Sequence, residues 1–263
     1  IPTWVIAALD ESSAFQLAQR PEMRRRMMQH LPELIPYFAQ AYDSAAALHY
    51  GDERIPAAQS INGCQQGCSF GTVLHGLAQM RRVQTLMAEF GDCLVLCMCD
   101  DVFILGPPDR VAAALTRYRE LVQADHGRLN LPKSIIWSPT AASTQHPDIQ
   151  ALAGVRETPD AALTGGFDVR GPDSGLRVLG HPLGADGYCR DFYMDKAVKT
   201  QTVVDKIIEV ADYSNPVSIQ AAYLQLRYCA EPKIAHLLRV GAPRSGCCSW
   251  RQSGLQRQCS NHV

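Results

Sequence analysis

Apolar and polar positions follow two different periods along the chain, and the change of period predicts where strands give way to helices. Thr3 to Leu9 is a short apolar run typical of a strand, and Ser12 to Tyr42 repeats apolar residues every three or four positions, as a helix does. A polar, turn-rich stretch, Gly51 to Gly71, follows, and Thr72 to Phe90 resumes the helical period. The first third of the chain is therefore predicted to be one strand followed by helices.

Two apolar runs flank an acidic pair in the middle of the chain. Cys93 to Cys99 precedes Asp100 and Asp101, and the sequence VFIL follows them, which predicts a hairpin. A helix over Arg110 to about Ala124 and a strand in Leu129 to Trp137 come next. The order of these elements predicts an α+β fold, with helices packed on one face of an antiparallel sheet.

The remainder of the chain is predicted to be mostly helical. Ser138 to Gly175 is rich in Pro, Gly, Thr and Ala and reads as a connection, after which Arg177 to Gly180 is strand-like. A helical pattern then runs from Asp191 to about Val240. We therefore divide the chain into a first domain over 1–185, a helical region over 186–245 and a flexible tail over 246–263.

Composition changes this picture only in part. The chain is 46% hydrophobic and carries a net charge of −1, which indicates a globular protein without the basic surplus that nucleic-acid binding usually requires. From Gly187 onward, however, ten basic residues stand against six acidic ones. The apolar runs are too short to span a bilayer, and the cysteines show no disulfide spacing. We expect a soluble, intracellular protein with reduced thiols.

The acidic residues at the strand ends are candidates for metal binding. Asp100 and Asp101 are adjacent carboxylates in an apolar hairpin, where their repulsion calls for a cation, although a solvated turn is the simpler reading of the pair alone. Asp10 also follows an apolar strand. Hard oxygen ligands from two strand ends suit Mg²⁺, and two such ions support in-line phosphoryl transfer.

Five segments in this order resemble the motifs of reverse transcriptases, in particular those of non-LTR retroelements. They are LDESSAF, GCQQGCSFGTVL, MCDDVFILGPP, LNLPKSIIW and RVLGHPLG, spread over residues 9–184. The resemblance implies a polymerase palm over 1–185 followed by a helical thumb-like region, with a fingers region missing upstream. It also implies that Asp10, Asp100 and Asp101 are the catalytic residues, holding Mg²⁺ or Mn²⁺.

The same resemblance implies the remaining site residues. Phe15 matches the steric gate against a ribose 2′-hydroxyl, and Lys133 matches a lysine near the triphosphate. The primer grip falls on Leu179 and Gly180. The nucleotide-binding residues implied in this way are Glu11, Phe15, Gln66, Gly67 and Lys133. Met98 departs from the motif, which normally carries Tyr or Phe at that position.

The function implied by the resemblance is RNA-directed DNA synthesis on an RNA template and a DNA primer, with dNTPs as substrates and no membrane partner. One alternative is an RNA-dependent RNA polymerase, against which Phe15 argues because RNA synthesis needs room for the 2′-hydroxyl. A second is a non-catalytic remnant that binds nucleic acid or protein. A nucleotide cyclase is a third, and the long helical extension argues against it. Residence in the nucleus would follow from a retroelement role.

The C-terminal tail carries four side chains that could bind zinc. They are Cys247, Cys248, Cys259 and His262. Their spacing fits zinc sites poorly, so a flexible tail is the favoured interpretation.

Overall fold

The computed structural model describes residues 3–50, 53–65, 67–155 and 162–240. The chain forms two compact units, Ile1–Leu176 and Arg177–Val263. The predicted domains over 1–185, 186–245 and 246–263 stay a prediction. The predicted nucleotide-binding residue Gln66 and the tail over 246–263, with its cysteines and histidine, lie outside the described residues.

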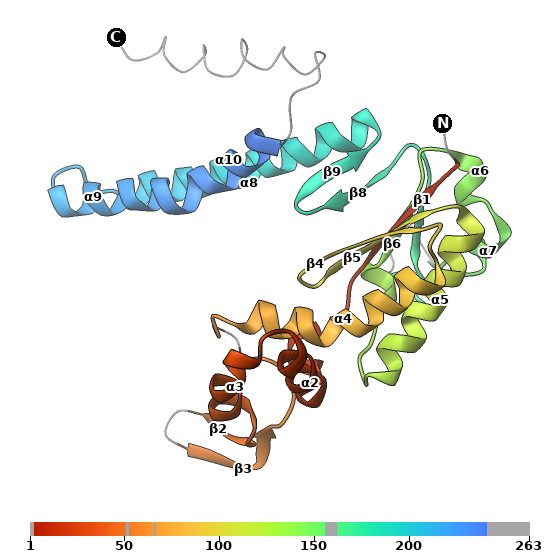
Figure 1. Cartoon of the computed structure of the whole chain (residues 1–263). Helices are drawn as coiled ribbons and strands as arrows, with labels where there is room; N and C mark the ends of the chain where they lie inside the picture. Colours follow the sequence, from red (N-terminus) through yellow and green to blue (C-terminus); the bar gives the residue numbers. More distant parts are fainter. Residues whose placement is uncertain (1–2, 51–52, 66, 156–161, 241–263) are drawn as a thin grey trace. The chain divides into compact units, whose positions relative to one another are not determined.

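The first unit is built on a five-stranded sheet (Figure 1). The strand order is β4-β5-β1-β6-β7, with bounds β1 (Val5–Leu9), β4 (Leu94–Met98), β5 (Asp101–Gly106), β6 (Ile135–Trp137) and β7 (Asp168–Arg170). Strand β1 is antiparallel to both β5 and β6, whereas β7 is parallel to β6. The α+β class is confirmed, but the prediction of a purely antiparallel sheet is wrong because β7 returns through a long connection and pairs in the same direction as β6.

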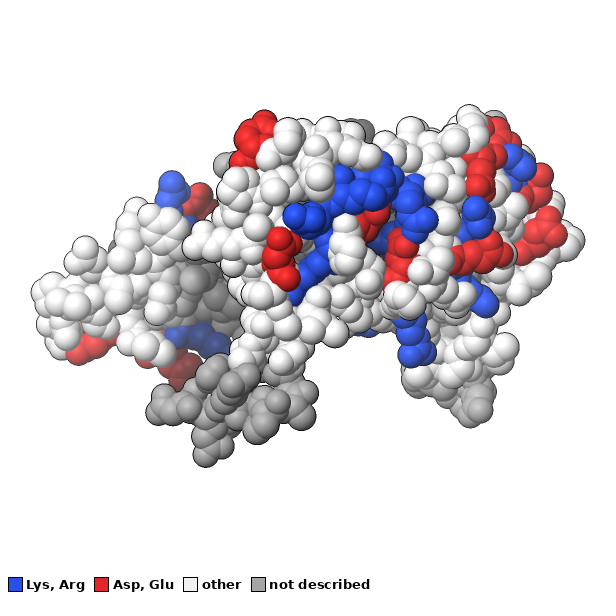
Figure 2. All heavy atoms as spheres, turned by 60° about the horizontal axis from the view of Figure 1, so that its bottom comes forward, with Lys and Arg blue, Asp and Glu red and all other residues white. Residues whose placement is uncertain are grey.

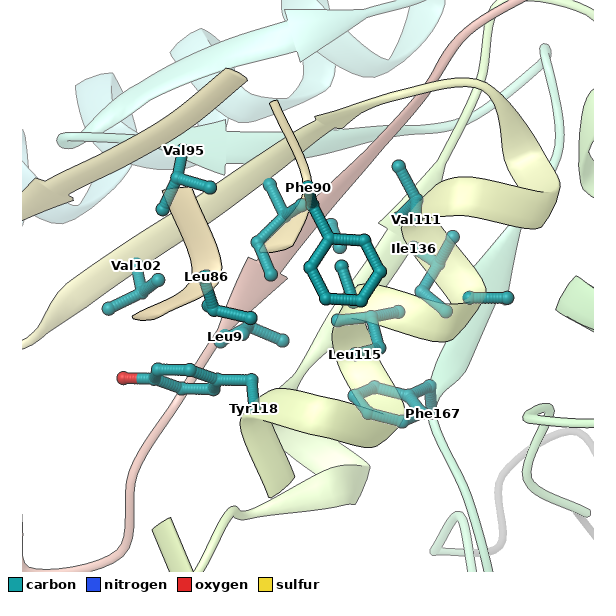
Figure 3. Packing of buried hydrophobic residues seen from close by; sticks show 14 of the residues in the cluster. Leu9, Leu86, Phe90, Val95, Val102, Val111, Leu115, Tyr118, Ile136 and Phe167 are labelled. Atoms are coloured by element: carbon teal, nitrogen blue, oxygen red, sulfur yellow. The ribbon is translucent and has the colours of Figure 1, made fainter. Parts of the chain in front are cut away.

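Two long helices cover one face of this sheet. Strand β1 alternates buried and half-buried positions, so Val5, Ala7 and Leu9 point into the core. Helices α4 (Gly71–Glu89) and α5 (Pro108–Ala124) supply the apolar side chains that meet them. Figure 3 shows this core, in which the ring of Tyr118 lies beside Leu9 and its hydroxyl group points away from the other side chains.

A second apolar cluster lies where α2 (Arg20–His30) and α3 (Ile35–Tyr42) pack with the first half of α4. Met23, Met27, Phe38 and Leu74 are almost fully buried in it. Short segments link this part of the unit: α1 (Ala14–Leu17) and a 3₁₀ turn, Pro32–Leu34. The helical prediction for residues 12–42 and 72–90 is confirmed.

Two local predictions are wrong. The stretch predicted to be turn-rich, Gly51 to Gly71, contains strand β3 (Glu53–Ser60), which pairs with the preceding strand β2 (Ala46–Tyr50) in a hairpin. Pro56 and the polar residues around it concealed this strand. The segment LNLPKSIIW is predicted to be one strand, but only Ile135–Trp137 is extended. Leu131–Lys133, which contains Pro132, is a 3₁₀ turn. The connection that follows contains α6 (Ala141–Thr144) and α7 (Pro147–Gln150).

The C-terminal unit is mostly helical, as the sequence predicts. Its hairpin strands are β8 (Gly175–Val178), which begins in the first unit, and β9 (His181–Gly184). Helices α8 (Asp186–Val210), α9 (Pro216–Gln225) and α10 (Glu231–Val240) follow, with a π-helical turn at Leu226–Ala230. In the described part of the chain no helix combines the length and the apolar character needed to cross a membrane.

Candidate active site

The register of β1 and β5 brings two of the predicted carboxylates to the same level of the sheet. Leu9 pairs with Val102, and both side chains are buried against the helices. The next residue outward on each strand is an aspartate, Asp10 on one and Asp101 on the other. Because side chains alternate between the faces of a strand, both aspartates belong to the face opposite the helical layer.

Hydrogen bonds from the segment after α5 fix the backbone of Asp10. Its N–H group donates to the hydroxyl of Ser134 at 3.0 Å, and its carbonyl accepts from the N–H of Asn130 at 2.8 Å. Ser134 is fully buried and donates in turn to the carbonyl of Asn130 at 3.0 Å. The position of this carboxylate is therefore set by β5 on one side and by residues 130–134 on the other.

The turn between β4 and β5 carries the third predicted carboxylate. Met98 pairs with Asp101, so Cys99 and Asp100 form the two-residue tip. Cys99 has a φ of 56°, a left-handed conformation that is costly for a residue with a side chain. Asp100 and Met98 are exposed. The tip thus presents a carboxylate to solvent next to Asp101, the first residue of β5.

Asp10 and Asp101 lie at neighbouring strand ends with Asp100 next to Asp101, and the three carboxylates do not enclose a metal site. Among the residues that the structure describes, no group of three or more His, Cys, Asp or Glu side chains is placed to hold one ion. Carboxylate oxygens are ligands that Mg²⁺ prefers, and this ion usually keeps several waters and shares substrate phosphates. Asp10 and Asp101 fit such a partial, open site.

Glu11, predicted to contact a nucleotide, follows Asp10, and its side chain is on the face of the sheet that the helices cover. Its carboxylate accepts hydrogen bonds from the Tyr118 hydroxyl at 2.6 Å and from Nη1 of Arg82 at 3.0 Å. Arg82 also lies 3.6 Å from the carboxylate of Asp125. A contact of Glu11 with a nucleotide stays a prediction, but the carboxylate already has two buried partners.

Burial and charge together shift the pKa values in this network. Burial raises the pKa of Tyr118 well above its ordinary value, and the negative charge of Glu11 adds to the effect. Burial lowers the pKa of Arg82, but Tyr118, Glu11 and Asp125 outweigh it and raise the pKa overall. Tyr118 is therefore a neutral donor and Arg82 a permanent cation beneath the strand end.

The loop that precedes α4 is held by a buried arginine. Arg20, 6% exposed, donates to the carbonyls of Ser60, Asn62 and Gly63, at 2.8, 3.2 and 3.1 Å respectively, and its guanidinium lies 5.2 Å from the ring centroid of Tyr42. The segment before the predicted nucleotide loop is thereby tied to the start of α2. Sequence reasoning missed Arg20, because an arginine in a helical, Arg-rich stretch resembles an exposed one.

Two glycines in the loop have left-handed backbones for different reasons. Gly63 has a φ of 73°, and a Cβ atom there would lie 2.3 Å from the carbonyl oxygen of Gln16. Gly67, predicted to line the nucleotide site, has a φ of 85° with nothing within 4 Å of a Cβ. The open space at Gly67 is compatible with the close approach of a ligand to the backbone.

Phe15 lies against this loop. Its carbonyl accepts a hydrogen bond from the N–H of Cys64 at 2.9 Å, and its ring stacks on that of His75 on α4. Lys133 is exposed on the 3₁₀ turn next to Ser134, which bonds Asp10. Lys133 therefore belongs to the turn that bonds the backbone of Asp10, and Phe15 is joined at Cys64 to the loop that precedes α4.

The predicted primer grip belongs to the C-terminal unit. Leu179 and Gly180 form the turn between β8 and β9, with φ values of 47° and 86°. A Cβ atom at position 180 would lie 2.7 Å from Nε2 of His236 on α10, and the positive φ also favours glycine there. The role of these residues stays a prediction.

Charged side chains are interspersed on the face of the molecule shown in Figure 2, where basic groups adjoin acidic ones. On α2, Arg25 and Arg26 both pair with Glu22, at 2.6 and 3.0 Å. Arg24 lies 3.4 Å from Asp43. Such pairing reduces the positive charge that these arginines would offer to a phosphate backbone.

Comparison with known proteins gives a partial similarity of structure. Neither a protein-family model nor a curated protein matches the sequence. Apo telomerase from Candida tropicalis superposes on 52% of this chain with a TM-score of 0.39 and 10% identity, covering 29% of its own length. Telomerase from Candida albicans, in complex with a TWJ fragment of telomeric RNA, superposes on 95% of the chain with a TM-score of 0.40 and 9% identity. The chain covers 42% of that telomerase, so it spans less than half the length of either.

Proposed function

We propose that the chain is a polymerase domain of the reverse transcriptase type, which adds deoxynucleotides to a DNA primer on an RNA template. The observation that carries the proposal is the pairing of Leu9 with Val102, beyond which Asp10 and Asp101 are the next residues at the ends of β1 and β5. The five segments that resemble reverse transcriptase motifs, as in non-LTR retroelements, support the choice of reaction. On this proposal, residues 1–185 form the palm and residues 186–245 the thumb.

The three carboxylates would hold divalent ions. Bound Mg²⁺ or Mn²⁺ at this position would supply charge stabilisation for the attacking 3′-hydroxyl and for the leaving pyrophosphate. Asp10 would contribute from a backbone fixed by Ser134 and Asn130, and Asp101 from the neighbouring strand. Asp100 would contribute from the exposed turn between β4 and β5.

The remaining residues would position the nucleotide. Lys133, exposed beside Ser134, would neutralise charge that develops on the triphosphate. Gly67 leaves open space where backbone can approach the nucleotide, and Phe15 would limit access to a ribose 2′-hydroxyl. These roles follow from the family resemblance together with the grouping of the residues in the first unit.

Primer extension tests the proposal directly. Wild-type chain is incubated with a DNA primer on an RNA template, Mg²⁺ and dNTPs, and compared with Asp10→Asn and Asp101→Asn. Asp109→Asn is the matched control, because it removes an exposed carboxylate on α5 outside the site. We expect extension by the wild type and the control, and loss of at least about a hundredfold in the two site variants.

Binding of Mn²⁺, followed by electron paramagnetic resonance, gives a second readout without turnover. Equal Mn²⁺ affinity in the wild type, Asp10→Asn and Asp101→Asn, together with no extension by the wild type, contradicts the proposal. Extension with NTPs in place of dNTPs assigns an RNA polymerase instead.

Binding without catalysis is a second candidate function. Met98, at the position where the reverse transcriptase motif normally carries Tyr or Phe, favours it. It predicts that the chain binds a primer-template duplex with equal affinity in the wild type and in Asp10→Asn, and that neither protein extends the primer.

A further inference from the structure

The ring of Phe15, the predicted steric gate, stacks on the ring of His75 in α4, the helix that follows the predicted nucleotide-binding loop. The rings of Phe15 and His75 have centroids 4.5 Å apart and an interplanar angle of 24°. Phe15 comes from the short helix α1, and His75 lies in the second turn of α4, after the loop that contains Gly67. Two segments distant in sequence therefore meet through these side chains.

His75 makes no use of its polar atoms in this position. It is 0% exposed, and neither ring nitrogen has a hydrogen-bond partner among the described residues. Burying an imidazole without partners costs free energy, so its presence calls for an explanation other than hydrogen bonding. Burial lowers its pKa, while Glu11 and Asp100 raise it and Arg82 lowers it further, so the ring is neutral near pH 7.

The backbone of Phe15 is already fixed, which leaves the direction of its ring as the remaining freedom. Its carbonyl accepts from the N–H of Cys64 at 2.9 Å, and the next two residues, Gln16 and Leu17, bond back to the carbonyl of Ser13 at 3.0 and 2.9 Å. The side chain of Phe15 is only partly buried, so a change of rotamer is prevented only where a neighbouring side chain blocks it. His75 provides a flat surface that selects the observed ring plane.

We propose that His75 is a positioning residue for sugar selection: its ring holds Phe15 in the orientation that excludes a nucleotide 2′-hydroxyl. The proposal rests on the proposed polymerase function and names the residue that makes its gate rigid. Without a ring at position 75, Phe15 turns aside and the site admits ribonucleotides. The effect is on selection between sugars, not on the chemistry of transfer.

The ratio of dNTP to NTP incorporation tests this role. The efficiency kcat/KM is measured for a dNTP and for the matching NTP with the full chain, in the wild type, His75→Leu, His75→Met and His75→Phe. We expect the preference for dNTP to fall on the order of tenfold in His75→Leu and His75→Met, which remove the flat ring. It stays at the wild-type level in His75→Phe, which keeps the stack.

The outcomes separate this role from the function on which it rests. No incorporation of either nucleotide by the wild type overturns the proposed function and sugar selection with it. An unchanged ratio in a folded, active His75→Leu or His75→Met variant overturns only the role of His75.

A spectroscopic readout does not depend on activity. With 4-fluorophenylalanine at position 15, the ¹⁹F resonance reports the environment of the ring. We expect the same shift in the wild type and His75→Phe, and a displaced, averaged resonance in His75→Leu. A resonance that is unchanged in His75→Leu overturns the proposal whether or not the chain polymerises.

Discussion

The hydroxyl group of Tyr118 lies 2.6 Å from the carboxylate of Glu11, one residue beyond Asp10 along the chain. Tyr118 is on α5, and Arg82 on α4 binds the other carboxylate oxygen of Glu11 at 3.0 Å. The two helices that cover the sheet thus both attach to the strand end that carries the candidate metal ligand. Glu11 acts as an internal anchor, whereas its neighbour Asp10 is on the opposite face.

Replacing Arg82 tests the strength of this anchor. Arg82→Met removes one partner of a buried ion pair and leaves Glu11 with Tyr118 alone, since Arg82 and Glu11 side chains are 7% and 5% exposed. Breaking a buried pair costs about 3–5 kcal/mol, because a charge is left without compensation. We expect that decrease in the free energy of unfolding, measured by urea denaturation.

Arg110→Met is the matched control for that experiment. Arg110 also binds a carboxylate, Asp92, at 2.6 Å, but both side chains are exposed and water can replace the contact. The urea midpoint of Arg110→Met should stay near that of the wild type. Equal destabilisation by the two substitutions would show that the pair of Glu11 and Arg82 is no stronger than a surface contact.

The buried imidazole of His75 predicts how stability depends on pH. Its pKa in the folded chain is below the ordinary value of 6.5, mainly because of burial, so the unfolded chain binds a proton first as pH falls. The contribution of His75 is therefore complete above pH 6.5 and decreases as the pH falls toward the folded pKa. His75→Phe should lose less stability than the wild type between pH 7.5 and 5, in urea titrations at each pH. A parallel loss in both proteins would contradict a depressed pKa.

Sequence patterns were sufficient for the parts of the fold that depend on local order. The run of apolar residues on each side of Asp100 predicts the hairpin, and the three-to-four residue period predicts α4. Strand β7 could not be predicted in the same way, because its parallel pairing with β6 depends on a long connection rather than on its own residues. The hairpin of β2 and β3 was missed since Pro56 and the polar residues around it are typical of turns.

The candidate site was predictable at the level of strand ends but not at the level of side-chain partners. That Asp10 follows an apolar strand is visible in the sequence, whereas its alignment with Asp101 depends on the register of β1 and β5. Glu11 and His75 look like surface residues by type. Their burial results from packing against α4 and α5, which no local pattern reports.

The close contact at Gly63 predicts a large effect of one methyl group. Gly63→Ala places a Cβ atom 2.3 Å from the carbonyl oxygen of Gln16, on a backbone with a φ of 73°. We expect a decrease of more than about 2 kcal/mol in the free energy of unfolding, since overlap and backbone strain combine. Thermal denaturation followed by circular dichroism measures it.

Two other glycines separate the causes of that effect. Gly165→Ala has a similar φ of 79° but nothing within 4 Å, so it should cost about 1 kcal/mol from strain alone. Gly76→Ala, in helix α4 with open space around it, should stabilise by about 0.5–1 kcal/mol. A Gly63→Ala variant no less stable than Gly165→Ala would exclude the contact with Gln16 as a source of destabilisation.

The turn that presents Asp100 is strained at its first central residue, and glycine there should relieve the strain. Cys99 has a φ of 56°, a conformation that costs a residue with a side chain about 1–2 kcal/mol, whereas glycine adopts it freely at some entropic cost in the unfolded chain. Cys99→Gly should therefore raise the free energy of unfolding by about 0.5–1 kcal/mol, in urea denaturation. Cys97→Gly, two residues earlier in β4, is the control and should destabilise, because it removes a thiol that donates to Gln79 at 3.0 Å and weakens a strand. If Cys99→Gly destabilises as well, the left-handed turn is not the conformation of the hairpin in solution, and Asp100 would stand differently toward Asp10 and Asp101.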